Sequence, residues 1–111
     1  MSVGVGWHHV QQFIKNNFGK KPDLETVLFL TGVQVLGAGH QTYTKEDKED
    51  LIHIAICTAL SYDGYFEKAG YTEDGWPDFD QIKPISQLSK EEQNDLIKLG
   101  LVKFFVEQEL I

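Results

Sequence analysis

Arginine is absent from this 111-residue sequence, and all ten basic residues are lysines scattered along the chain. Arginine's planar guanidinium is the usual group for bidentate binding of phosphate and guanine. The 17 acidic residues outnumber the lysines and leave a formal net charge of −7, so a nucleic-acid backbone would meet net repulsion. We therefore expect no nucleic-acid binding and no adsorption to an anionic membrane surface.

The sequence also has a single cysteine, Cys57, and no long apolar run. One cysteine cannot form an internal disulfide. The longest stretch without charge, 26–44, is interrupted by glycines and carries Gln34, His40 and Gln41, whereas a membrane span needs about 20 mostly apolar residues. The first ten residues show no basic segment leading into an apolar run, as a secretory signal would. These features predict a cytoplasmic protein without a membrane span.

The chain does contain enough apolar material for one folded domain. Its composition is 41% hydrophobic and 12% aromatic, which is not that of a disordered segment. A chain of this length buries roughly two-thirds of its unfolded surface, enough for one core. Two domains would have only about 55 residues each, so we expect residues 1–111 to form a single domain.

Four segments have helical patterns, and we expect an all-α, four-helix bundle-like domain. The first helix is expected over 7–18, where apolar residues recur at spacings of three and four. The second, over 24–36, is apolar on nearly every side. The third follows Thr44, a favoured N-cap, and extends to Tyr62. Only a narrow stripe of this third helix is polar, which predicts a place at the centre of the bundle.

The fourth helix is expected over 90–110, after a capping box formed by Ser89 and Glu92. Its part 101–106 is rich in valine and phenylalanine and could also be a strand, although the spacing of apolar residues favours a helix. The segments 24–36 and 90–110 are apolar on more sides than a monomer of this size would bury. We therefore also expect a homodimer formed through the last helix.

A long loop, 63–88, is expected between the third and fourth helices. The stretch from Tyr62 to Asp80 contains six of the thirteen aromatic residues, together with six acidic residues and one lysine. The aromatic side chains can pin the loop to the core. They can also form, with the carboxylates, a recognition surface for a protein partner, and above all for a basic one. The candidate partner-binding residues are Tyr65, Tyr71, Asp74, Trp76, Asp78 and Phe79.

A divalent-cation site is the alternative function. Asp50, His53 and Cys57 stand at i, i+3 and i+7, so they share one helix face and combine three metal-ligating groups. The solvent-exposed face that a mostly buried helix needs is the better explanation of the same stripe. Three loop carboxylates offer a second set, although their spacing does not match an EF-hand: Asp74, Asp78 and Asp80.

No residue pattern argues for catalysis. Cys57 has His53 one helical turn away but no recognisable third group to orient it, and no glycine-rich phosphate loop is present. We therefore expect a small, acidic, non-enzymatic interaction protein without a cofactor, acting through a partner or self-association surface. A cation-binding domain is the alternative, and an enzyme of unknown chemistry is the weakest hypothesis.

Overall fold

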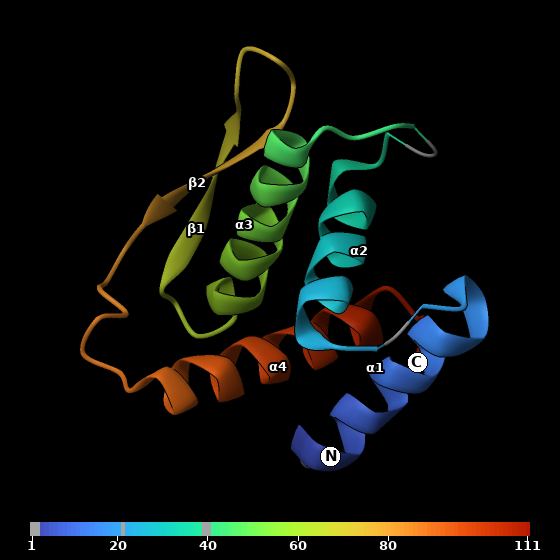
Figure 1. Ribbon diagram of the computed structural model, residues 1–111. Helices are drawn as coiled ribbons and strands as arrows, with labels where there is room; N and C mark the ends of the chain where they lie inside the picture. The colour runs from blue at the N-terminus through green and yellow to red at the C-terminus, as the bar shows by residue number, and fades with distance from the viewer. Residues whose placement is uncertain (1–2, 21, 39–40) are drawn as a thin grey trace.

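The computed structural model describes residues 3–20, 22–38 and 41–111. This part of the chain contains four α-helices and one two-stranded sheet (Figure 1). In chain order the elements are α1 (Val3–Phe18), α2 (Leu24–Leu36), α3 (Lys45–Ser61), β1 (Phe66–Tyr71), β2 (Pro77–Gln81) and α4 (Lys90–Glu107). The protein is mostly helical, as expected, but the all-α prediction is wrong for the segment between α3 and α4.

The segment expected to be a loop, 63–88, contains an antiparallel hairpin of β1 and β2, in which Lys68 lies opposite Phe79. At the hairpin tip the Gly75 N–H donates to the Thr72 carbonyl at 2.9 Å, and Gly75 has a φ of 82°. A short hairpin loop commonly places a glycine in this left-handed conformation, where other residues are strained. Aromatic residues in both strands add β-propensity, so the segment forms a hairpin rather than an irregular loop.

Helices α2, α3 and α4 each begin directly after an N-cap residue: Asp23, Thr44 and Ser89. The Asp23 carboxylate accepts a bond from the Thr26 N–H at 2.8 Å. The expected capping box of Ser89 and Glu92 is confirmed, with both bonds at 3.0 Å. The segment 101–106 is part of α4 and is therefore helical. The observed α1 begins earlier, and the observed α4 ends earlier, than the apolar patterns predict.

Helix α3 occupies the centre of the fold, as predicted, because α2, α4 and both strands contact it. Figure 1 shows α2 alongside α3, α4 crossing below the ends of both, and the hairpin on the remaining side of α3. Helix α1 packs mainly against α4. The helices do not share one axis direction, so the arrangement is not clearly a four-helix bundle. The hairpin takes the side of α3 where a bundle would place another helix.

The core combines buried side chains from all four helices. Its members are Val10, Ile14, Val27, Leu28, Ala55, Ala59, Leu60, Ile97, Leu101, Val102, Phe104 and Phe105. The rings of Phe13 and Phe105 meet edge to face at 5.7 Å and join α1 to α4. Among the described helices, none combines the length and the apolar character that a membrane span requires.

Two glycines bring neighbouring helices directly against the backbone of α3. Gly32 on α2 lies against the carbonyl group of Leu51, and Gly100 on α4 lies against that of Ala59. A Cβ at either position would overlap these backbone atoms, which cannot move aside by changing a rotamer. Glycine inside a helix costs roughly 0.5–1 kcal/mol relative to alanine. The two glycines are needed in spite of this cost, because α2 and α4 could not approach α3 so closely with any larger residue at these positions.

Gly32→Ala and Gly100→Ala are expected to lower the free energy of unfolding by roughly 1–3 kcal/mol, because α2 or α4 must move away from α3. Gly4→Ala is the matched control, since a Cβ added at Gly4 meets no heavy atom of the described residues within 4 Å outside its own stretch of α1. That variant should be as stable as the wild type or slightly more stable. Urea unfolding followed by circular dichroism measures all three. Equal stability of the Gly32→Ala, Gly100→Ala and Gly4→Ala proteins would contradict the direct contact of α2 and α4 with the backbone of α3.

Candidate functional site

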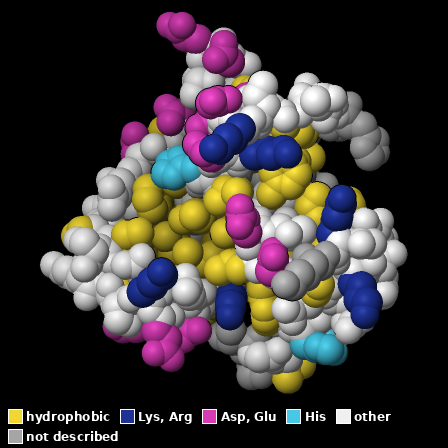
Figure 2. All heavy atoms as spheres, in the orientation of Figure 1, with side chains coloured by type: hydrophobic (Ala, Val, Ile, Leu, Met, Phe, Trp, Pro, Cys, Tyr) yellow, Lys and Arg dark blue, Asp and Glu magenta, His cyan; other side chains and the backbone are white. Residues whose placement is uncertain are grey.

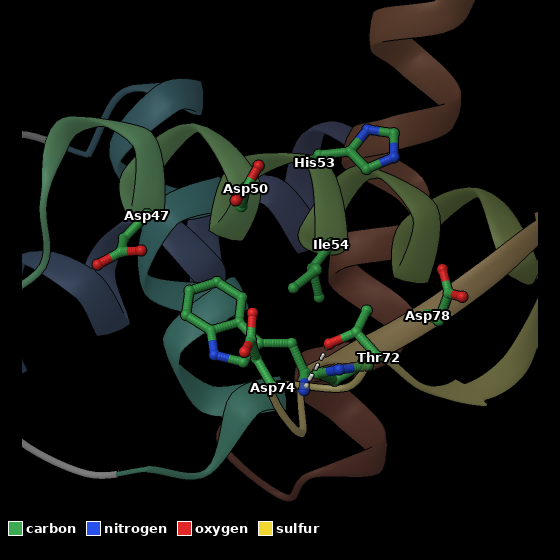
Figure 3. Close-up of a pocket in the computed structure, with 9 residues that line it drawn as sticks. Asp47, Asp50, His53, Ile54, Thr72, Asp74 and Asp78 are labelled. Carbon is green, nitrogen blue, oxygen red and sulfur yellow. Dashed lines mark hydrogen bonds between the residues drawn. The ribbon is translucent and has the colours of Figure 1, made fainter.

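A cleft of about 510 Å³ lies between the N-terminal half of α3 and the hairpin (Figure 3). It is lined by Asp47, Asp50, His53 and Ile54 from α3 and by Thr72, Asp74, Trp76, Pro77 and Asp78 from the hairpin. Four carboxylates therefore share one cleft, and no lysine is among these lining residues. Figure 2 shows acidic side chains gathered over the hairpin tip and the start of α3.

The helical repeat of α3 places two of its four acidic residues, Asp47 and Asp50, on one side of the cleft. Asp47, Asp50 and Ile54 are three and four residues apart, so they lie one above the other on the helix. Asp47 also closes the N-terminal capping box, because its Oδ2 accepts a bond from the Thr44 N–H at 3.1 Å. In Figure 3 the Ile54 side chain points into the space between α3 and the hairpin. The positive end of the helix dipole favours carboxylates in this first part of α3.

The hairpin tip forms the opposite wall. The Trp76 N–H donates to the Thr72 hydroxyl at 3.2 Å (dashed in Figure 3), and the Thr72 N–H donates to the Trp76 carbonyl at 2.8 Å. These two bonds fix the tip, on which Asp74 precedes the turn glycine. Trp76 is half-buried and Pro77 is buried, so part of the indole stays open to solvent.

Farther along α3, Cys57 is fully buried and its Sγ lies 3.5 Å from Nε2 of His53. Burial raises the pKa of the Cys57 thiol to about 11, and the negative charge of Asp78 adds to this effect. The thiol is therefore protonated at neutral pH and is a poor nucleophile. The predicted solvent-exposed stripe is wrong at Cys57, because the hairpin packs on this side of α3; Asp50 and His53 are exposed.

The structure does not assemble the predicted metal ligands into one cluster. In the described residues, no three His, Cys, Asp or Glu side chains are arranged to hold a metal ion. His53 and Cys57 are in contact, but Cys57 is buried whereas Asp50 is exposed and faces the cleft. Of the three loop carboxylates, Asp74 and Asp78 line the cleft and Asp80 does not.

The candidate partner-binding residues separate into two groups. Asp74, Trp76 and Asp78 line the cleft. Tyr65 instead packs against the core and carries the Lys83 ammonium 4.4 Å above its ring centroid, so it anchors the hairpin. Two further candidates also lie outside the cleft: Tyr71, which is 65% exposed, and the half-buried Phe79.

Four residues of the cleft were not among the candidates. Asp47 precedes Asp50 by three residues, and this helical spacing was a readable signal. Thr72, Pro77 and Ile54 carry no such signal, because only the hairpin and its packing bring them to the site. No family model, no curated protein and no solved structure matches this chain, so the site is interpreted from its geometry.

The raised pKa of Cys57 makes stability depend on pH in the alkaline range. The ordinary thiol pKa of 9.0 applies to the unfolded chain, against about 11 in the folded protein. Below about pH 9 the thiol is protonated in both states, and the buried neutral thiol contributes fully to the free energy of unfolding. This contribution is lost as the pH rises through about 11, because the thiol then ionises in the folded protein as well. Its size is at most roughly 2–3 kcal/mol.

Cys57→Ala removes this contribution while leaving the lysines and tyrosines that titrate in the same range. We expect the stability difference between wild type and Cys57→Ala to shrink from about pH 8 to about pH 10.5. Urea unfolding at both pH values measures it. A difference that stays constant across this range would contradict the raised pKa.

Proposed function

We propose that this protein is a non-enzymatic interaction module whose cleft between α3 and the hairpin binds a basic segment of a partner protein. The observation that carries this proposal is the convergence of four carboxylates and a half-exposed indole on one cleft. Self-association through the last helix stays a prediction that rests on a different surface.

Electrostatics favours a cationic ligand at this site. The chain has a net charge of −7, and four of its carboxylates lie in the cleft without a lysine among the lining residues. A concentration of one sign of charge steers oppositely charged partners and raises their association rate. A basic segment gains this attraction, whereas an acidic one is repelled.

The cleft offers both kinds of surface that a lysine or arginine side chain can use. Such a side chain can place its aliphatic stem against Trp76, Pro77 and Ile54 and its charged end among the carboxylates. Hydrogen bonds between a cationic donor and a carboxylate are stronger than neutral ones. An indole face adds a cation–π attraction, a contact that the Lys98 ammonium already makes with Trp7, 5.5 Å from its ring centroid.

The side chains that line the cleft favour ligand binding rather than catalysis. The cleft offers acceptors and an apolar wall, and the thiol nearest to it, Cys57, is buried and protonated. An activated cysteine needs a lowered pKa, which is the opposite of the shift at Cys57.

Asp78→Asn is expected to weaken binding of an acetylated oligolysine peptide by roughly threefold to tenfold, because it removes one cleft carboxylate. Asp80→Asn is the matched control, since it removes the same charge from the same strand outside the cleft. Isothermal titration calorimetry at low and high salt measures both, and added salt should weaken wild-type binding. Equal effects of the two substitutions would show general charge attraction and would contradict a binding cleft.

Trp76→Ala tests the apolar wall of the same cleft. Because the indole is half-exposed, we expect this variant to keep its circular dichroism spectrum and to lose more than about tenfold in peptide affinity. Unfolding of the variant would make Trp76 a structural anchor and would argue against its role in recognition.

A divalent cation is the competing occupant of these carboxylates. It would raise the thermal unfolding midpoint when calcium or zinc replaces EDTA, and Asp78→Asn would remove the rise. Such a rise, together with no affinity for the oligolysine peptide, would replace the proposed function by cation binding.

A further inference from the structure

We propose that a second copy of this chain docks on an apolar groove of α4, so that the protein is a two-fold symmetric dimer. The groove has a volume of about 430 Å³. It is lined by Tyr62, Leu99, Val102, Lys103, Val106 and Glu107, and is called the α4 groove below. Its occupant is a second copy because the groove carries complementary charges within one helix.

The floor of the α4 groove is a stripe of aliphatic side chains. Leu99, Val102 and Val106 follow one another at spacings of three and four, so they lie along one side of the helix. Val106 is 47% exposed and Leu99 is half-buried, whereas Val102 belongs to the core and is 6% exposed. Covering the exposed part of Val106 removes apolar surface from water, which favours association.

Two opposite charges flank this stripe. Glu107 accepts a hydrogen bond from the Tyr62 hydroxyl at 2.6 Å through Oε2, which holds its side chain at the edge of the groove. Within the described residues, Lys103 makes no ion pair with Glu107, although the two are four residues apart on α4. Lys103 therefore has a cationic group available for a partner at this edge.

In a two-fold symmetric dimer, Lys103 and Glu107 of each copy can pair with the opposite charge of the other copy. A dimer of this kind places the same surface of each copy against the other, with the two α4 helices antiparallel. If the axis passes between the two α4 helices at the level of residue 105, Lys103 of one copy faces Glu107 of the other, and the reverse pair forms at the same time. The two valines at 106 then lie close to the axis. The α4 groove is thus self-complementary, whereas the cleft between α3 and the hairpin carries one sign of charge and repels its own copy.

The two surfaces lie at different ends of α3. The cleft begins at Asp47, near the N-terminus of α3, and the α4 groove includes Tyr62, just after its C-terminus. A dimer formed through the α4 groove therefore leaves both clefts open. Two clefts on one particle would let a partner with two basic segments bind with avidity.

Charge reversal gives a test that depends on the register. Lys103→Glu and Glu107→Lys each place like charges opposite one another, so each variant alone should be monomeric at concentrations where the wild type has twice the mass of one chain. An equimolar mixture of the two variants should recover the dimer, because each glutamate then faces a lysine of the other chain. Sedimentation equilibrium on the full chains measures these masses.

Three controls separate the groove from general effects. Val106→Glu should abolish the dimer, whereas Ile82→Glu, at a 56% exposed aliphatic side chain after β2, should not. Tyr62→Phe removes the bond to Glu107 without changing charge and should keep the dimer. A monomeric wild type at about 100 µM, a dimer that survives Val106→Glu, or a variant mixture that stays monomeric would each overturn the proposal. Circular dichroism verifies that every variant is folded.

Discussion

The fold depends on the contact of two helices with the bare backbone of α3. Because Gly32 and Gly100 have no side chain, α2 and α4 approach the carbonyl groups of Leu51 and Ala59. These contacts occur at two levels of α3 and leave one side of it uncovered by helices. The hairpin packs on that side, and the cleft exists only because the hairpin tip faces the first turns of α3. The position of the candidate site is thus a consequence of close helix packing elsewhere.

The hairpin divides one polar stripe of α3 into two environments. Near the N-terminus of α3 the hairpin tip stands off far enough to leave a cleft, and Asp50 and His53 stay exposed. Further along, at Cys57, the side chain is fully buried and its thiol keeps its proton. Desolvation penalises the charged form of a group, so the same helix face carries charge at one end and a neutral thiol at the other.

The helices could be predicted from the sequence because their signals are local. The capping box of Ser89 and Glu92 and the helical spacing of apolar residues act within a few residues of each other. The hairpin could not be predicted in the same way, because its strands hold residues that disfavour strands, such as Gly70 in β1 and Pro77 in β2. The Asp-Gly turn at Gly75 and the aromatic residues of both strands pointed to it, and packing on α3 compensates for the strand residues that disfavour a sheet.

The candidate site shows the same division between local and tertiary information. Asp50 and His53 on one side, and Asp74, Trp76 and Asp78 on the other, were identifiable as separate groups, and only the fold brings them to one cleft. The two proposals rest on different charge patterns at the two surfaces. A surface of one sign cannot pair with its own copy and suits a different, basic chain, whereas a surface with both signs at helical spacing suits a second copy of itself. Because the two surfaces lie at different ends of α3, the two proposals do not exclude each other.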